Sequence, residues 1–217
     1  MNKRLEIIFS EIPACLSFAD VGCDHGYIAK AVLDSGKCDD VVISDISAPS
    51  LNKAEKLLKR YIDCGKARAV VCDGLSLVPE RNTVLISGMG GEEIIKILSE
   101  APFKTERLIL SPMKNQDKVR AYLLENGYGI TKDYTFCDQR FYHLIIAEFG
   151  KNIEPYTAVE LEFGRDNLKL RPTDFILYIK KELEKAETYK NKVVSKEDKE
   201  LFEQRIKKLR GMINENQ

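Results

Sequence analysis

Acids and glycines cluster in one short run near the N-terminus, and their types and spacing suit a charged ligand. The run reads Asp20-Val-Gly-Cys-Asp-His-Gly26. Apolar residues at 16, 18, 19 and 21 indicate a short buried strand, and residues 27–33 have the apolar spacing of a helix. Glycines let a ligand approach the backbone closely, and a helix N-terminus offers unpaired N–H groups. The run therefore predicts a ligand-binding turn between a strand and a helix.

The acids in this turn indicate which ligand it takes. Its glycines are spaced G-x-x-x-G, whereas dinucleotide-binding folds use G-x-G-x-x-G. Carboxylates at Asp20 and Asp24 would repel a pyrophosphate, but they suit a ligand that carries an ammonium and a sulfonium, which is S-adenosylmethionine (SAM). A nicotinamide cofactor is the less favoured alternative. The turn residues assigned to the SAM site are Asp20, Gly22, Asp24, His25, Gly26 and Tyr27.

Strand-like and helix-like segments alternate along the next hundred residues. Strands are expected near 41–44, 67–72, 83–86 and 108–110, and the pattern is that of five strand–helix units. Two further strand-like runs, 128–136 and 141–149, surround a short polar segment and predict a β-hairpin. The sequence thus predicts an α/β fold of the Rossmann-like class I SAM methyltransferase type. Its seven-stranded, mostly parallel sheet would end in the antiparallel hairpin.

Two acids follow predicted strands, where such sheets bind their ligands. Asp45, with Ile46 beside it, ends the second strand and is expected to bind the ribose hydroxyls of the cofactor. Capping of the following helix is the alternative role for Asp45. Asp73 ends the third strand and is placed to accept a hydrogen bond from the adenine amino group, and its neighbours Gly74 and Leu75 are assigned to the cofactor as well. A turn that Gly74 opens without any ligand is the alternative.

A glycine-rich segment follows the fourth strand, where the transferred methyl group is expected to project. Gly88, Met89, Gly90 and Gly91 leave room for a planar substrate and free N–H groups for hydrogen bonds. A purely structural turn is the alternative. We assign Gly88 and Met89 to the cofactor, and Met89, Gly90, Gly91 and Asn115 to the substrate.

Several segments in order resemble those of the bacterial TrmK-type tRNA (adenine-22-N1)-methyltransferases, from about residue 4 to 172. The matching segments are Asp20-Val-Gly-Cys-Asp-His25, Asp45 to Ala54, Asp73-Gly-Leu75, Ile86-Ser-Gly-Met-Gly-Gly91, Leu108-Ile-Leu-Ser-Pro112, Arg120 to Gly127, Phe141-Tyr-His-Leu-Ile145 and Phe163 to Leu168. The resemblance implies SAM-dependent methyl transfer to N1 of adenine 22, with tRNA as the partner. A methyltransferase of another RNA or of a small molecule, and a non-catalytic RNA-binding module, remain alternatives.

Chemistry at adenine N1 makes few demands on the protein. The N1 lone pair is neutral at pH 7 and needs no deprotonation, so alignment with the methyl donor is the main requirement. The methylated adenine is cationic, and a nearby carboxylate would stabilise the developing charge. We therefore assign Asp24 as the catalytic residue, with His25 as a weaker candidate for which a structural role at the helix start is the alternative.

A helical tail follows the predicted methyltransferase domain, which we place at residues 1–155. Within residues 156–217, apolar spacings of three and four predict two amphipathic helices that form a coiled-coil-like hairpin. Lys181 and Arg205 are expected at solvent-facing positions, where they could hold tRNA phosphates. Packing or dimerisation is the alternative role for the tail.

Composition excludes several other classes of protein. Lys plus Arg number 34, as do Asp plus Glu, so any nucleic-acid contact must come from a local patch. The six cysteines lack zinc-site spacing, which predicts no metal and reduced thiols in a cytoplasmic protein. No long apolar span is present, so no membrane association is expected. We expect a monomer or a weak dimer.

Overall fold

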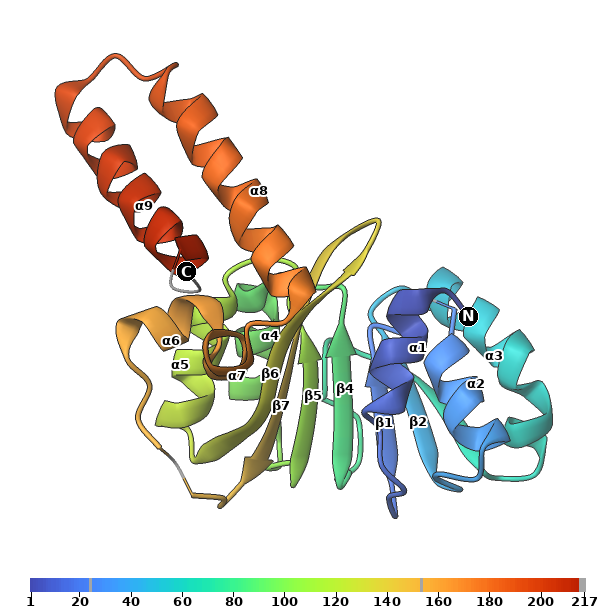
Figure 1. Cartoon of the computed structure of the whole chain (residues 1–217). Coiled ribbons are helices and arrows are strands. Elements are labelled where there is room, and N and C mark those ends of the chain that lie inside the picture. The colour runs from blue at the N-terminus through green and yellow to red at the C-terminus, as the bar shows by residue number, and fades with distance from the viewer. Residues whose placement is uncertain (24, 153, 215–217) are drawn as a thin grey trace.

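A single seven-stranded sheet organises the chain (Figure 1). The computed structural model describes residues 1–23, 25–152 and 154–214. The strand order is β3-β2-β1-β4-β5-β7-β6, with β1 to β5 parallel and β7 antiparallel to both of its neighbours. The strands are β1 (Phe18–Val21), β2 (Val41–Asp45), β3 (Ala67–Val71), β4 (Thr83–Ser87), β5 (Arg107–Ser111), β6 (Tyr128–Asp138) and β7 (Arg140–Phe149). This topology confirms the predicted fold class.

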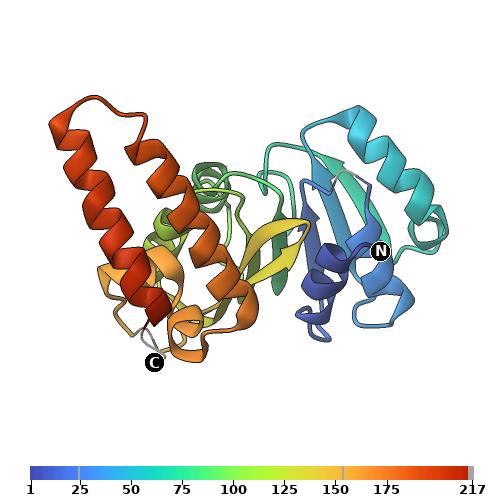
Figure 2. The same cartoon turned by 45° about the horizontal axis from the view of Figure 1, so that its top comes forward.

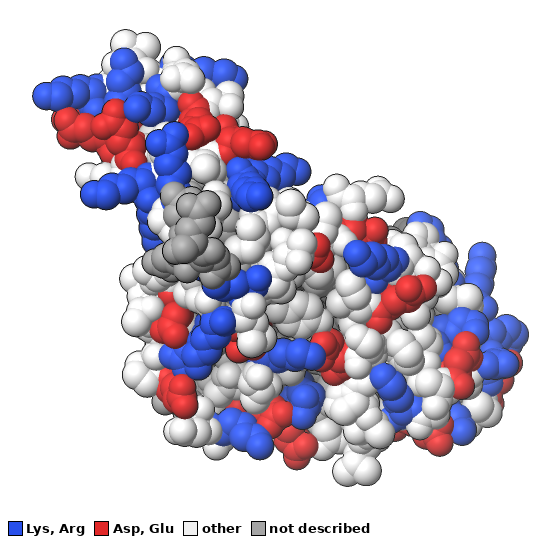
Figure 3. Space-filling view, in the orientation of Figure 1, with Lys and Arg blue, Asp and Glu red and all other residues white. Residues whose placement is uncertain are grey.

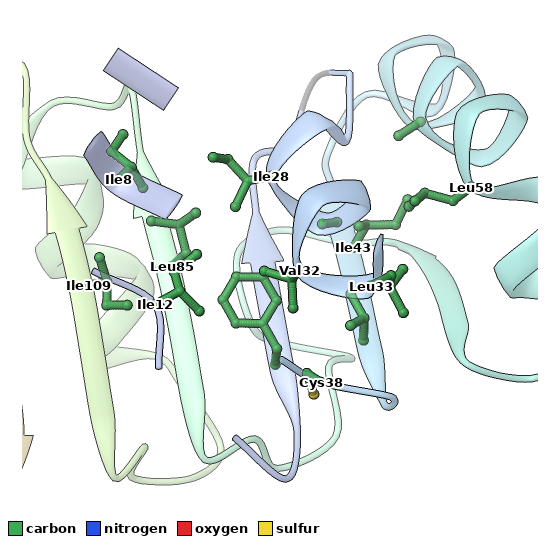
Figure 4. Close-up of a cluster of buried hydrophobic side chains, with 14 of the residues drawn as sticks. Ile8, Ile12, Ile28, Val32, Leu33, Cys38, Ile43, Leu58, Leu85 and Ile109 are labelled. Carbon is green, nitrogen blue, oxygen red and sulfur yellow. The ribbon is translucent and has the colours of Figure 1, made fainter. Parts of the chain in front are cut away.

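Helices cover both faces of the sheet. One face packs against α1 (Lys3–Ser10), α2 (Tyr27–Asp34) and α3 (Ala48–Asp63), and the other against α4 (Gly91–Ser99) and α5 (Gln116–Glu125). Each face of the sheet has its own hydrophobic core, and successive strand residues point alternately into one core and the other. Leu85, for example, lies in the first core and Ile86 in the second. Figure 4 shows the first core, where Ile8 and Ile28 from the helices face Leu85. Strands buried on both faces therefore read as continuous apolar runs.

Two sequence expectations about local structure are wrong. Leu16 is 84 % exposed and precedes β1, because the chain enters the sheet only at Phe18. The described residues 72–82 between β3 and β4 form turns and contain no helix. Gly74, at φ +57°, and Pro79 interrupt this segment, so the pattern of five strand–helix units fails after β3.

The tail begins with two short helices, and part of it covers the open edge of the sheet. These are α6 (Ala158–Phe163) and α7 (Arg165–Leu170), followed by the long helices α8 (Thr173–Lys190) and α9 (Lys196–Asn214). Side chains of α7 and α8 accept hydrogen bonds of 2.9 Å from alternate N–H groups of edge strand β6. The pairs are Asp133 with Asp166, Thr135 with Asn167, and Cys137 with Asp174. The tail thereby covers an edge that would otherwise offer unpaired donors.

The long helices α8 and α9 form the predicted antiparallel hairpin. Figures 1 and 2 show it projecting from the end of the molecule opposite α2 and α3. A third core holds its base, where Phe163 of α6 packs with Phe175 and Ile179 of α8 and Leu209 of α9. The described residues contain no helix long and apolar enough to cross a bilayer.

Candidate active site

The turn after β1 forms through two glycines in left-handed conformation. Gly22 and Gly26 both have φ +69°. A Cβ at Gly22 would lie 2.0 Å from Cε of Met89, and a Cβ at Gly26 would lie 2.9 Å from Cβ of Ala54. Gly22 thus allows the loop after β4 to approach β1, whereas Gly26 allows α2 to pack on α3. The role of Gly26 that the structure shows is this packing.

A pocket of about 440 Å³ lies at the carboxyl ends of β1 and β4. Five residues predicted for the cofactor site line it: Asp20, Gly22, His25, Tyr27 and Gly88. The pocket has six further lining residues that the sequence did not predict, which are Asn2, Arg4, Leu5, Cys23, Ile28 and Ser87. The first three come from the N-terminal segment, whose sequence signals only an amphipathic helix. We refer to this pocket as the turn pocket.

Asp20 is the buried acid of the turn pocket. Its residue is 5 % exposed, and burial raises the pKa of its carboxyl to about 7. A hydrogen bond with the backbone N–H of Ala29 opposes that rise. The ionised form of Asp20 is therefore poised near neutral pH, and a cationic ligand group beside it would favour ionisation.

His25 lines the turn pocket next to Tyr27, and the two ring centroids are 5.4 Å apart. Asp24, our first catalytic candidate, lies outside the described residues. The structure therefore brings one of the two catalytic candidates to the pocket.

The two strand-end acids lie outside the turn pocket and already have protein partners. A carboxylate oxygen of Asp45 accepts a hydrogen bond from the backbone N–H of Ser47 at 2.8 Å. Ser47, and not Asp45, is the N-cap of α3, so the alternative of direct helix capping is wrong. Asp73 forms an ion pair of 2.9 Å with Lys96. A ligand of Asp73 would have to share this carboxylate with Lys96.

The residues beside these acids differ in exposure. Ile46 is 72 % exposed and could cover a bound ligand next to Asp45. Leu75 belongs to the second core, and a Cβ at Gly74 would lie 2.8 Å from side-chain atoms of Ile97. The Leu75 side chain is therefore not available for the cofactor contact that the sequence predicted. A ligand could contact only the backbone atoms of Gly74 and Leu75.

The glycines after β4 are used for contact between two loops. Gly88 donates its N–H to the carbonyl of Ser111 at 3.2 Å, and Gly91 donates to that of Lys114 at 2.9 Å. The expectation of free N–H groups is therefore wrong at these two positions. A Cβ at Gly91 would lie 2.5 Å from the carbonyl oxygen of Asn115, which explains the glycine in steric terms.

A second pocket, of about 340 Å³, lies between the β5–α5 loop and α8. It brings together two predicted substrate residues, Asn115 and Lys181, although 66 positions separate them in the chain. A neighbouring hollow of about 300 Å³ along α8 shares Lys181 and Lys185. We call the two hollows together the basic groove, defined by Lys114, Arg140, Lys181, Lys185 and Lys192.

Acids do not neutralise most of the basic groove. Among the described residues, Lys185 is the only one of its five cations with a carboxylate partner within 4.0 Å, which is Glu182. His143 at its edge is buried, which lowers its pKa to about 3 and leaves the imidazole neutral. Figure 3 shows that Lys and Arg side chains, with acids among them, crowd the projecting hairpin. Such uncompensated cations suit a polyanion.

Arg205 does not occupy the solvent-facing position that the sequence predicted. Its side chain is 31 % exposed, forms an ion pair with Glu162 and lies 5.2 Å from the ring centroid of Phe163. Lys208 also pairs with Glu162. Arg205 therefore fastens α9 to α6, and its position in an apparently exposed helical stripe did not reveal this contact.

A family model described as a methyltransferase domain matches residues 1–146, which include the sheet through most of β7 and both walls of the turn pocket. The chain belongs to this methyltransferase family. The match agrees with the strand order and the terminal hairpin. In the described parts of this methyltransferase, no group of three or more His, Cys, Asp or Glu could hold a metal ion.

Relatives support the same grouping. A Mycoplasma pneumoniae protein provisionally named a tRNA methyltransferase is 33 % identical over 135 residues, covering 60 % of this methyltransferase and 62 % of the relative. The chain therefore spans less than two thirds of that relative's length. The tRNA (adenine(22)-N(1))-methyltransferase of Bacillus subtilis is 26 % identical over 170 residues, covering 76 % and 71 %.

Among solved structures, M. capricolum TrmK in complex with S-adenosyl-homocysteine has a TM-score of 0.86. It is 23 % identical, and the alignment covers 99 % of this methyltransferase and 98 % of that chain. The likeness shows that the fold, including the helical tail, is shared. The methyltransferase fold expected from the sequence is thus confirmed, and the B. subtilis relative carries the expected resemblance to the TrmK-type family.

Proposed function

We propose that this chain transfers the methyl group of SAM to N1 of adenine 22 in tRNA. The observation that carries the proposal is the adjacency of the turn pocket and the basic groove. Arg4 lines the turn pocket and Arg140 lines the groove, and both guanidiniums lie against the ring of Tyr142, 4.9 and 5.1 Å from its centroid. A site for a small cationic cofactor therefore adjoins a site for a polyanion.

The residues of the turn pocket fit SAM. Buried Asp20 offers a carboxylate to its ammonium group, and Gly22 lines the same pocket. Asp45 retains a second carboxylate oxygen for the ribose hydroxyls, and Asp73 is proposed to contact the adenine. When bound, SAM supplies the electrophilic methyl group.

The remaining residues act on the substrate. We assign the segment Gly88–Gly91 to the position where the target adenine meets the cofactor, with Met89 beside Gly22. Asp24 is proposed to stabilise the cationic product, and His25 to position the turn. The name of the relative from B. subtilis supports tRNA as the substrate. Work on tRNA would place the protein in the cytoplasm.

Methylation of an unmodified tRNA transcript tests the proposal. With SAM present, we expect 1-methyladenosine in the nucleoside digest and a primer-extension stop at position 22. A transcript with guanine at position 22 should stay unmodified. If the protein binds SAM but methylates neither transcript, its substrate is another RNA or a small molecule and the tRNA assignment is wrong.

Affinity for SAM should depend on pH through Asp20. Because its pKa in the folded protein is about 7, the carboxyl is mostly protonated at lower pH and cannot pair with the ammonium group. We expect affinity to rise by about ten-fold between about pH 5.5 and 7.5, and Asp20→Asn to remove the dependence. Titration calorimetry with S-adenosylhomocysteine measures it, and an equally steep pH profile in Asp20→Asn would contradict the assignment.

The raised pKa of Asp20 should also make the stability of the ligand-free protein fall as pH rises, whereas its affinity for SAM rises. Between pH 3.8, the ordinary pKa of an aspartate side chain, and about pH 7, the folded protein keeps the Asp20 proton that the unfolded chain has lost. Proton binding then favours the folded state, so the contribution of Asp20 to stability falls as pH rises through this window. Asp20→Asn should therefore stabilise the ligand-free protein above pH 7.

A further inference from the structure

We propose that Arg4 binds the α-carboxylate of the bound cofactor. This inference rests on SAM being the ligand of the turn pocket, as proposed above. It assigns a cofactor-binding role to α1, a helix that carries none of the glycine-turn or strand-end motifs.

The Arg4 guanidinium faces the turn pocket at the end of β4. Its Nη2 lies 3.3 Å from the position that a Cβ on Gly88 would occupy. Its Nε is buried and has no hydrogen-bond partner among the described residues. Buried polar atoms are normally paired, so an unpaired guanidinium nitrogen beside a pocket indicates a missing acceptor.

Neighbouring groups hold Arg4 in place without neutralising it. Its backbone N–H donates to a carboxylate oxygen of Asp138 at 3.0 Å, and its guanidinium stacks on Tyr142. The Tyr142 hydroxyl is already engaged by Nε of Arg140 at 2.7 Å. Within the described ranges no carboxylate lies within 4.0 Å of the Arg4 guanidinium. A half-buried cation fixed in this way is preorganised for an anion.

The carboxylate of the cofactor is a better match for Arg4 than a phosphate of the RNA. Asp20 lines the same pocket and is the acid that we assign to the cofactor's ammonium group. In an α-amino acid the ammonium and carboxylate groups are attached to one carbon, so a pocket that offers Asp20 and Arg4 together is complementary to both. The phosphate-binding cations line the separate basic groove.

Comparing SAM with decarboxylated SAM isolates the contact, because the two ligands differ only in the carboxylate. For the unmodified protein, titration calorimetry should give an affinity for SAM about ten-fold to a hundred-fold higher than for the decarboxylated ligand. In Arg4→Gln this preference should disappear, while affinity for decarboxylated SAM stays within about two-fold. Lys3→Gln is the matched control, since Lys3 bonds the carbonyl of Cys137 and does not line the pocket.

The outcomes separate the possible failures. If Arg4→Gln keeps the preference for SAM, Arg4 does not bind the carboxylate and the inference is overturned. If its SAM affinity is unchanged while tRNA binding falls, Arg4 holds an RNA phosphate instead. An unmodified protein that binds neither ligand overturns the proposed cofactor itself. Should Arg4→Gln not fold, Arg4→Lys keeps the charge without the guanidinium, and an undiminished preference there contradicts a fork-shaped contact.

Discussion

Arg120→Met is expected to lower the free energy of unfolding by about 3–5 kcal/mol, because it leaves Asp133 as an uncompensated buried carboxylate. Both side chains are buried, and Arg120 meets the two carboxylate oxygens at 2.8 and 2.9 Å. Its third nitrogen donates to the carbonyl of Leu161 at 2.8 Å. Arg120 therefore joins α5, β6 and α6, and its loss should loosen the tail together with the sheet edge.

Urea denaturation with paired variants checks the Arg120 prediction. The double variant Arg120→Met, Asp133→Leu should recover at least about 1 kcal/mol relative to Arg120→Met, since the unpaired charge is gone. Exposed Lys118→Met on the same helix is the control and should change stability by less than about 0.5 kcal/mol. A loss below about 1 kcal/mol in Arg120→Met would contradict the view that this ion pair secures the tail.

Reversing two charges of the basic groove should weaken tRNA binding by more than about ten-fold at low salt without unfolding the protein. Lys181→Glu with Lys192→Glu is the chosen pair, because both side chains are exposed and line the groove. Each lost phosphate contact should also reduce the slope of log affinity against log salt by about 0.7–0.9. Gel-shift titrations at several salt concentrations give both quantities.

A matched charge change elsewhere on the hairpin distinguishes the groove from general charge. The double variant Lys180→Glu, Lys199→Glu makes the same change in net charge on the same hairpin, at exposed positions outside both hollows. This control should lose much less tRNA affinity and keep the parent salt slope. Equal losses in both double variants would show that the hairpin attracts RNA only through its overall charge. Equal affinity in all three proteins would make the tail a packing element.

Arg205 is unsuitable for a charge reversal that is meant to test RNA binding alone. Arg205 looked as exposed as Lys181 on a helical stripe, yet it pairs with Glu162 and covers Phe163. Arg205→Glu would set two carboxylates against each other, so it would report on stability as well as RNA binding. Likewise, a chain cut near Gly164 would remove the side-chain acceptors for three N–H groups of β6 and expose the sheet edge.

The order of elements and the place of the glycine turn after β1 could be predicted from the sequence, because both depend on local signals. Apolar runs such as 41–44 and 108–110 are buried on both faces, and glycines mark the turn at residues 22–26. A parallel sheet then brings the carboxyl ends of its strands to one edge, whichever side chains the strands carry. This is why Asp20, His25 and Gly88 were expected at one site and lie there.

Contacts between distant segments were decided only by the tertiary structure. Nothing in the spacing of residues 3–10 indicates that Arg4 lines the turn pocket, or that Lys181 meets Asn115 in one groove. Partners such as Asp133 for Arg120 depend on which helix packs over which strand. Local periodicity specifies the face that an element buries, and the chain path through the folded molecule specifies what that face meets. The sequence by itself therefore determined the fold class and the sheet edge that carries the turn pocket, and the packing of α1 and the tail decided which further residues line that edge.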